Sequence, residues 1–303
     1  MIKMFDMFNQ QEDSDSQENQ ESEHNSDFNA PSGNTFVLSI GGSLLVKAKP
    51  DSEMIQKISE AISELHSAGK RIVIVVGGGK TARNYVEAMN VSNNFEKDLM
   101  GIQVTRANAF LLASQIPECH KEILTEIPKV KEILDSGKIP VFGGLMPFFT
   151  TDAVGALLAE FLEANFVNIT NVDGIYNANP KDYPDAKRYD EISYSSLIDL
   201  ISSSGSEPGQ NVVLDLACCM ILKRSLIPAV VLDGNDIENL KNYINGYSFI
   251  GTTIKENASE EMRNEEVEEL MEKPKRKPKK KRKIKVHKDD KEFSADDVDY
   301  LKL

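Results

Sequence analysis

Residues 71–83 read RIVIVVGGGKTAR, an apolar run that ends in three glycines and a short polar segment. An unbroken run of branched apolar side chains is typical of a parallel strand that is buried on both faces. Glycines at the end of such a strand let the backbone approach a phosphate closely, and the N–H groups of a following helix point at the anion. The stretch therefore predicts a buried strand, a phosphate-binding turn and a helix that carries Arg83.

Similar apolar runs lie on both sides of this stretch. They are Phe36 to Ile40, Ile139 to Phe142, Phe166 to Thr170 and Ala229 to Leu232. Apolar residues recur at three- and four-residue spacing after the expected helix cap Asp51 and again after Asp152, which indicates amphipathic helices. Alternating strands and helices predict an α/β fold, a three-layer αβα sandwich with a mostly parallel central sheet. Ligands are then expected at the carboxyl ends of the strands.

Composition divides the chain into three segments. Residues 1–34 hold eight acidic residues against Lys3 and few apolar ones, so we expect a disordered acidic arm. Residues 35–254 carry the strand and helix pattern and are the expected folded domain. Residues 255–303 are an expected flexible tail, in which 273–288 hold eleven Lys or Arg. This run is either a solvated tail or a weak anchor for RNA, DNA or an acidic partner.

The whole chain has a net charge of −13 at pH 7, which would ordinarily argue against nucleic-acid binding, but the charge is unevenly spread and the middle segment is only mildly acidic. The longest apolar stretches fall far short of the roughly 20 residues that cross a bilayer, and the N-terminus lacks the apolar region of a secretory signal. We therefore expect a cytoplasmic protein with no membrane association. Cys119, Cys218 and Cys219 have no zinc-like spacing and are expected to be buried thiols.

The first expected strand also ends in glycines, as Ile40-Gly41-Gly42-Ser43. Neither glycine turn matches the Walker phosphate-binding loop or the dinucleotide-binding GxGxxG pattern. Two such turns in one domain suggest two phosphates. The alternative is that the glycines only permit tight packing. Packing alone explains two such turns less well, because Arg83 lies one turn into the helix that follows the second of them.

Two further loops carry polar residues at the ends of expected strands. GGLMPFFTTD, residues 143–152, places two threonine hydroxyls at the start of a helix, and Asp152 is either the helix cap or a carboxylate that organises reacting groups. TNVDGIYNANP, residues 170–180, is a polar loop with one aromatic ring that is suited to hold a nucleotide base. The alternative for Tyr176 is simple packing.

Together these stretches resemble the amino-acid-kinase family over residues 36–254. GGS at Gly41, GGGKTAR at Gly77 and TNVDGIYNANP at Thr170 are similar to the nucleotide-binding loops of the whole family. KDLMGIQVTRANA, residues 97–109, resembles the archaeal branch of the family's UMP kinases, and PFFTTDA, residues 147–153, resembles the corresponding bacterial loop. The resemblance implies that ATP phosphorylates the phosphate of UMP in pyrimidine nucleotide biosynthesis, with Mg²⁺ as cofactor and a homohexamer as the assembly.

The resemblance also implies roles for the residues that match its motifs. Arg83 and Asp152 would be catalytic, with Asp152 as an orienting carboxylate. The ATP-binding residues would be Gly42, Ser43, Gly79, Arg83, Thr170, Asn171, Tyr176 and Asn179. The UMP-binding residues would be Gly78, Asp98, Leu145, Met146, Pro147, Phe148, Phe149, Thr150 and Thr151. Within this set Asp98 would accept hydrogen bonds from the ribose hydroxyls, and no protein side chain is assigned to the metal.

The chain departs from the family at two positions where lysines are often found. Ser39 stands two residues before the first glycine pair, and Met220 stands five residues after Asp215. Positive charge would then come from magnesium, from Arg83 and from Lys47 or Lys80.

Two alternatives to UMP phosphorylation stay open. One is another small-molecule kinase of the same family, against which Asp98 and PFFTTDA argue because they suit a ribose and a base. The other is a non-catalytic nucleotide-binding or storage protein, which the missing lysines and the charged arms would suit.

Overall fold

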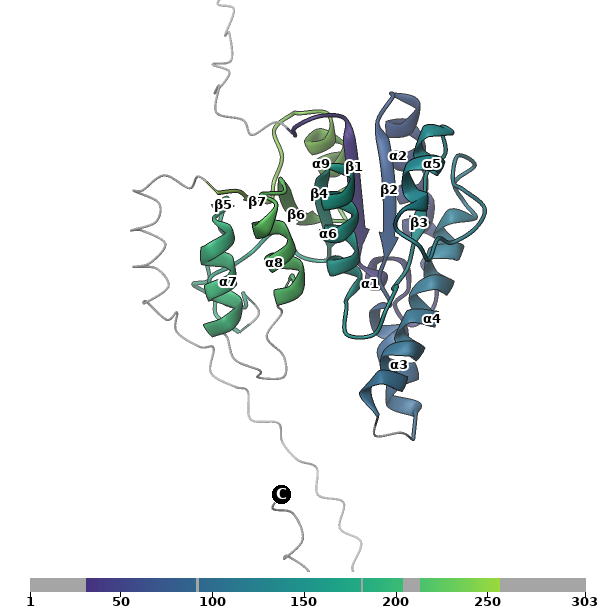
Figure 1. Cartoon of the computed structure of the whole chain (residues 1–303). Coiled ribbons are helices and arrows are strands. Elements are labelled where there is room, and N and C mark those ends of the chain that lie inside the picture. The colour runs from purple at the N-terminus through teal and green to yellow at the C-terminus, as the bar shows by residue number, and fades with distance from the viewer. Residues whose placement is uncertain (1–30, 91–92, 181, 204–212, 257–303) are drawn as a thin grey trace, which may run out of the picture.

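Strand β1 (Thr35–Ile40) lies inside the sheet that organises the protein and has a parallel neighbour on each side. The computed structural model describes residues 31–90, 93–180, 182–203 and 213–256. Within these residues the sheet has seven strands in the order β3-β2-β1-β4-β6-β7-β5 (Figure 1). The other strands are β2 (Arg71–Val76), β3 (Val141–Phe142), β4 (Asn165–Thr170), β5 (Glu191–Ile192), β6 (Ala229–Asp233) and β7 (Thr252–Ile254).

Most neighbouring strands run parallel, which confirms the predicted sheet. Ser39 on β1 pairs with Val75 on β2 and with Asn168 on β4, so the carboxyl ends of these three strands come level. Strand β7 is the exception, because it runs antiparallel to β6. The ligand-binding edge predicted for parallel strands is therefore the edge at which β1, β2 and β4 end.

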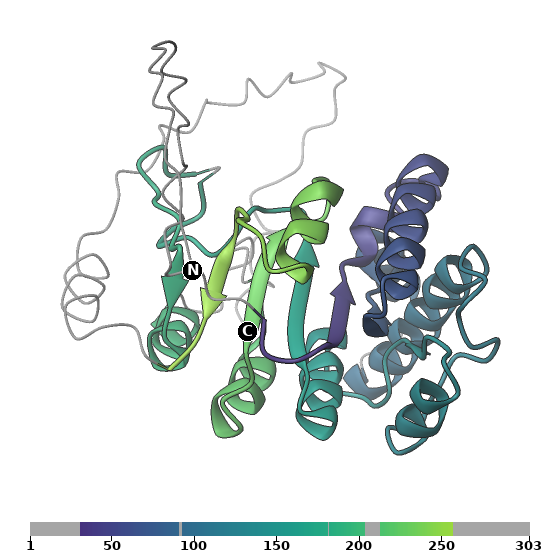
Figure 2. The same ribbon diagram turned by 90° about the horizontal axis from the view of Figure 1, so that it is seen from above.

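Helices cover both faces of the sheet, as the view in Figure 2 shows. One face carries α1 (Gly42–Leu45), α2 (Ser52–Ser67), α4 (Asn94–Ala113) and α9 (Ile237–Ile244). The other face carries α5 (Lys129–Asp135), α6 (Thr151–Leu162), α7 (Tyr194–Ser203) and α8 (Leu216–Arg224). Helix α3 (Gly79–Ala88) packs against α4 and buries no residue completely. The three-layer αβα sandwich is therefore confirmed.

Alternate residues of β1 face the two layers. Phe36, Leu38 and Ile40 join the core under α2 and α4, whereas Val37 joins the core under α6 and α8. Strands that are buried on both faces need apolar residues at every position, which explains the unbroken runs in the sequence. Asp51 accepts a hydrogen bond from the backbone N–H of Met54, which confirms the predicted cap of α2.

One predicted strand is shorter than expected, and two strands were not expected. Ile139 forms only an isolated bridge to Cys119, and Pro140 has no N–H to donate, so the ladder with β2 begins at Val141. Strands β5 and β7 are too short and too polar to produce an apolar run. They extend the sheet beyond β6, where β7 runs antiparallel to β6 and β5 runs parallel to β7.

Several predictions from composition meet the structure only in part. Cys119, Cys218 and Cys219 are free and buried, as predicted. No helix among the described residues is long and apolar enough to cross a membrane. The acidic arm, the Lys-rich tail and its 273–288 run lie outside the described residues, apart from 31–34 and 255–256.

Candidate active site

The two glycine turns that follow β1 and β2 lie in direct backbone contact. A Cβ on Gly42 would lie 2.2 Å from the carbonyl oxygen of Gly77, and a Cβ on Gly79 would lie 2.6 Å from the backbone nitrogen of Ser43. Gly79 also has a φ of +60°, which side chains disfavour. The glycines thus have the packing role that was raised as an alternative. The same packing leaves bare backbone where α3 begins, which suits an anion.

A cleft of about 440 Å³ opens beside these turns. Its walls come from α3, from α4 and from the segment that links β3 to α6. The predicted residues that line it are Gly78, Gly79, Arg83, Asp98, Met146, Phe148, Phe149, Thr150 and Thr151. The arginine predicted to face phosphates and the acid predicted to bind a ribose therefore share one hollow.

Residues that the sequence patterns did not single out also line the cleft. They are Ala82, Val86, Glu87, Lys97, Gly101, Ile102, Thr105 and Gly144. Lys97, Gly101 and Thr105 follow at four-residue spacing and so share one face of α4. This spacing was visible in KDLMGIQVTRANA and could have placed the three residues on one helix face. Only Asp98 was named from the sequence, because only Asp98 matched a role known in the family.

Asp98 connects α4 to the loop on the other side of the cleft. Its Oδ2 accepts a hydrogen bond from the backbone N–H of Phe148 at 2.9 Å. Phe148 has a φ of 76° and its side chain is 83 % exposed. Thr105 holds the same segment further along, because its Oγ1 accepts from the N–H of Gly144 at 2.7 Å. The loop from Gly144 to Phe148 is thus fastened to α4 at two points.

Two of the expected loop residues lie differently from the others. Leu145 is half-buried and packs against the core under α6, as Phe149 also does, so only part of each side chain faces the loop surface. Pro147 is half-buried and is not among the residues that line the cleft. Of the two phenylalanines in the motif, Phe148 alone projects into solvent.

Two cations reach the cleft without a carboxylate partner. Arg83 comes from α3 and Lys97 from α4, and neither forms an ion pair with another residue in the described part of the chain. Lys47, by contrast, pairs with Asp51 at 2.9 Å, and Lys80 is exposed and lies outside the lining of the cleft. The cations free to meet an anionic ligand are therefore Arg83 and Lys97.

The start of α6 shows that the prediction of Asp152 as the helix cap is wrong. Thr150 is the cap, because its Oγ1 accepts from the N–H of Ala153 at 3.1 Å. The Thr150 hydroxyl also donates to the carboxylate of Asp215, which itself caps α8. Asp152 lies in the first turn and accepts a hydrogen bond from the hydroxyl of Ser39 at 2.6 Å. Asp152 is therefore not the helix cap.

The surroundings of Asp152 favour its protonated form. Burial raises the pKa of this carboxyl to about 6, the hydrogen bond from Ser39 opposes the rise, and the charge of Asp215 adds to it. Asn168 pairs with Ser39 across the sheet, and its side-chain amide also lowers the pKa of Asp152, although the position of its buried Nδ2 falls short of hydrogen-bond geometry with any described residue. The carboxylate is thus surrounded by neutral groups and one like charge. Of the two positions at which the sequence resemblance leads us to expect a lysine, Met220 is 54 % exposed and Ser39 is 2 % exposed.

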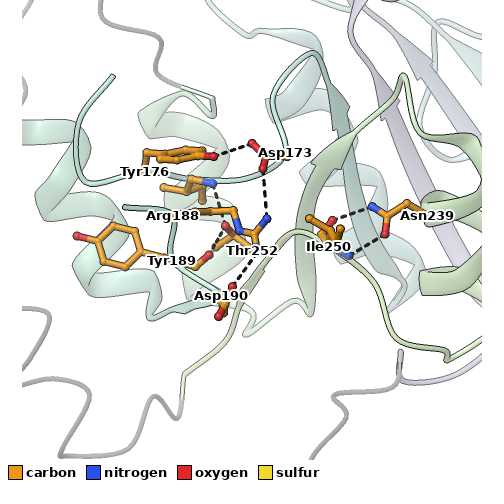
Figure 3. A network of polar contacts seen from close by, with 9 residues as sticks. Asp173, Tyr176, Arg188, Tyr189, Asp190, Asn239, Ile250 and Thr252 are labelled. Carbon is orange, nitrogen blue, oxygen red and sulfur yellow. Dashed lines mark hydrogen bonds and ion pairs between the residues drawn. The ribbon is translucent and has the colours of Figure 1, made fainter. Parts of the chain in front are cut away.

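The loop after β4 is held by a network of polar contacts (Figure 3). The Tyr176 hydroxyl donates to Oδ1 of Asp173 at 2.9 Å, and Nη1 of Arg188 donates to Oδ2 of the same carboxylate at 3.2 Å. Arg188 also pairs with Asp190 at 2.9 Å. The network fixes the hydroxyl of Tyr176 and leaves its ring half-buried.

A second set of contacts joins this loop to the edge of the sheet. The N–H of Ile175 donates to Oγ1 of Thr252 at 2.8 Å, and the Thr252 hydroxyl donates to the carbonyl oxygen of Tyr189 at 2.5 Å. Strands β5 and β7, which the sequence did not reveal, therefore support the loop predicted to bind ATP.

The first glycine turn lies between the cleft and the loop after β4. The N–H of Gly41 donates to the carbonyl oxygen of Ile169, and the N–H of Gly77 donates to that of Ile40, both at 2.9 Å. Predicted residues outside the lining of the cleft are Gly42, Ser43, Leu145, Pro147, Asp152, Thr170, Asn171, Tyr176 and Asn179. Most of these were assigned to ATP. The structure thus offers two regions that meet at Gly42 and Ser43.

Comparison with known proteins identifies the family to which this fold belongs. The model of the amino acid kinase family matches residues 34–233. The chain belongs to the amino acid kinase family. Among family members, the uridylate kinase of Pyrococcus abyssi is 43 % identical over 224 residues, which cover 73 % of this chain and 99 % of that protein. The uridylate kinase of Methanocorpusculum labreanum is 42 % identical over 226 residues, 73 % of this chain and 96 % of that protein.

Solved structures of amino acid kinase family members show the same fold. The crystal structure of uridylate kinase from Archaeoglobus fulgidus matches with a TM-score of 0.65 at 38 % identity, covering 72 % of this chain and 99 % of that one. UMP kinase from Bacillus anthracis matches with a TM-score of 0.62 at 19 % identity, covering 76 % of this chain and 98 % of that one, and supports the fold alone.

Proposed function

We propose that this chain is a UMP kinase, which transfers the terminal phosphoryl group of ATP to the phosphate of UMP. The observation that carries the proposal is the cleft in which Gly78, Arg83 and Asp98 meet the loop that ends in Thr150 and Thr151. Arg83 suits the phosphate of a nucleoside monophosphate, and the Asp98 carboxylate suits its ribose hydroxyls. The kinship with uridylate kinases of 36–43 % identity supports the same acceptor.

The layout of the site suits an in-line transfer between two nucleotides. UMP occupies the cleft beside β2, ATP lies over the loop after β4, and the backbone of Gly42 and Ser43 lies between them. Phosphoryl transfer requires mainly alignment and neutralisation of charge, because its transition state is loose. The acceptor oxygen already belongs to a phosphate, so no strong general base is required.

Asp152 acts as a positioning carboxylate in this account. With a pKa of about 6 it is ionised in neutral solution, and Ser39 fixes the direction of its Oδ1. The Thr150 cap holds the first turn of α6 and therefore the backbone on which Asp152 lies. The geometry supports a role in orienting the groups around the transferred phosphoryl group.

Magnesium fits this site as a companion of the nucleotide. No group of three or more His, Cys, Asp or Glu side chains among the described residues could hold a metal ion by itself. Mg²⁺ is usually held by substrate phosphates and one or two carboxylates, for which Asp152 and Asp215 are the candidates here. When bound, the ion neutralises charge on the phosphates. Arg83 and Lys97 supply the positive charge that the chain itself contributes.

The oligomeric state and the cellular location that we propose are those that the family resemblance implies. We propose a homo-oligomer, a hexamer by family resemblance, that works in the cytoplasm in pyrimidine nucleotide biosynthesis. Large apolar side chains on α3 and α4 support an assembly, because Tyr85, Phe95, Leu99 and Phe110 are between 42 % and 60 % exposed. Light scattering of the purified chain tests this, and a monomer at micromolar concentration would contradict it.

Product analysis tests the proposed reaction. The chain is incubated with ATP, Mg²⁺ and UMP, and the nucleotides are separated by anion-exchange chromatography. Equal amounts of UDP and ADP are expected. ADP without UDP, or neither product, would contradict the proposal. The alternatives of another acceptor and of a non-catalytic protein receive no support from the comparisons.

A further inference from the structure

Gly101 lies in the interior of a helix, at a position where packing does not require a glycine. It lies in α4, and glycine inside a helix is unfavourable relative to alanine because its backbone loses more freedom on folding. Every other glycine among the described residues either has a positive φ or would bring a Cβ within 4 Å of a neighbour. Gly101 has neither property, because a Cβ there would meet no atom within 4 Å.

The glycines of the phosphate-binding turns provide the contrast. A Cβ on Gly78 would lie 2.5 Å from that of Ala82, and one on Gly143 would lie 2.7 Å from Oγ1 of Thr105. Replacing these glycines would force the protein itself to move. Replacing Gly101 would displace no atom of the residues that the structure describes, so the reason for a glycine is sought in a bound ligand.

The open space beside Gly101 belongs to the cleft. Gly101 lines it together with Asp98, three residues earlier, and Thr105, four residues later. These residues lie on neighbouring turns of one helix face, separated along the axis by about 5 Å per turn. Met146 and Phe148 line the same cleft from the loop that Asp98 fastens. A side chain at position 101 would therefore occupy room between α4 and this loop.

We infer that Gly101 is a specificity-determining residue of the acceptor site, where the missing side chain lets the nucleoside part of the monophosphate lie against the backbone of α4. A ribose that bonds to Asp98 extends across the next turn of the helix, which is the turn of Gly101. This inference rests on the proposed function and adds the wall against which the sugar and base are placed. The helix gives up stability at this position to make room for the ligand.

The variant Gly101→Ala tests the inference through readouts that move in opposite senses. The melting temperature of the unliganded protein is expected to rise by about 2–4 °C, because alanine is the better helix former. The KM for UMP is expected to rise by about tenfold or more, as an added methyl group in a fitted pocket typically causes. The KM for ATP is expected to stay within about twofold, because ATP lies beyond β1.

Gln103→Ala is the matched control. Gln103 lies on α4 two residues further on, is exposed and does not line the cleft. This variant should leave both KM values within about twofold of wild type.

Two results would overturn the inference alone. A lower melting temperature for Gly101→Ala would show that the glycine serves packing, and an unchanged KM for UMP would show that the ligand does not reach it. These two results bear on the inference when the wild-type protein phosphorylates UMP in the same assay. Wild-type protein without UMP turnover would instead contradict the proposed function, and the inference would fall with it.

Discussion

Ser39 on β1 donates a hydrogen bond from its hydroxyl to Oδ1 of Asp152 on α6 at 2.6 Å. Ser39 is one of the two positions at which the sequence resemblance leads us to expect a lysine. Here the partner is neutral, the carboxyl is shielded from water, and Asp215 adds a like charge. Burial raises the pKa of Asp152 to about 6, the charge of Asp215 adds to the rise, and the hydrogen bond from Ser39 opposes it without cancelling it.

Asp152→Asn should stabilise the fold in neutral solution while it lowers turnover. The folded-state pKa of about 6 exceeds the value of 3.8 for an aspartate free in water, so the folded state holds the proton more tightly. Stability therefore falls as the pH rises through this window and stays reduced above it. The variant escapes that loss, and its gain in the free energy of unfolding should be about 1–3 kcal/mol at pH 8 and smaller at about pH 4.5.

Urea denaturation of both proteins at the two pH values measures this gain. Asp135→Asn is the control, since Asp135 forms an exposed ion pair with Arg71 and should change stability by less than about 1 kcal/mol. A variant that is less stable than wild type at pH 8 would show that the Asp152 carboxylate is not strained by burial.

Ser39→Ala should move the acid limb of the pH–rate profile toward higher pH. The Ser39 hydroxyl lowers the pKa of Asp152, so its removal raises that pKa further and a higher pH is needed to ionise the carboxylate. The measurement is kcat for UMP between about pH 5 and 9. Ser59→Ala removes another buried hydroxyl, which bonds to Ile55 on α2, and should leave the profile in place. An acid limb that does not move in Ser39→Ala would separate Asp152 from the rate-determining step.

Arg83→Ala should lower kcat/KM for UMP by about 10²–10³. Arg83 lines the cleft without an ion-pair partner among the described residues, so its charge is available to the phosphates, and its side chain makes no hydrogen bond there that the variant would lose. Lys80→Ala on the same helix is the control, because Lys80 lies outside the lining of the cleft and should matter little. Equal steady-state rates for Arg83→Ala and wild type would refute the placement of Arg83 on a phosphate.

The sequence predicted the parts of the fold that depend on runs of apolar residues. β1, β2, β4 and β6 are long and buried on both faces, and each follows the expected run to within a residue or two. β5 and β7 have two and three residues, and their place depends on contacts such as Thr252 with Tyr189, which no local pattern encodes.

The candidate site was predictable where a residue type implies its chemistry. Arg83 could be named because a cation one turn after a glycine turn suits phosphate, and Asp98 could be named from the resemblance of residues 97–109 to the family. Lys97 and Gly101 could not, because their importance depends on which face of α4 meets the cleft. The raised pKa of Asp152 also required the structure, since it arises from burial and from Asp215, 63 positions away in the sequence.

Arg188→Met should raise the KM for ATP by about three- to tenfold and leave the KM for UMP nearly unchanged. Arg188 ties Asp173, in the loop after β4, to Asp190 beside β5, as Figure 3 shows. Loss of the guanidinium frees the loop predicted to carry the ATP base, and the cleft for UMP lies on the other side of β1. Arg71→Met, which breaks an exposed ion pair with Asp135, is the control. A rise in the KM for UMP alone would place the two nucleotides the other way round.

Acceptor specificity tests the central claim most directly. The rate of ADP release from ATP and Mg²⁺ is measured with UMP, CMP, AMP, acetylglutamate and carbamate as acceptors, and kcat/KM is compared. The account predicts that UMP is preferred by at least about tenfold over every other acceptor. Preference for a different acceptor, or no ADP release with any of them, would contradict it.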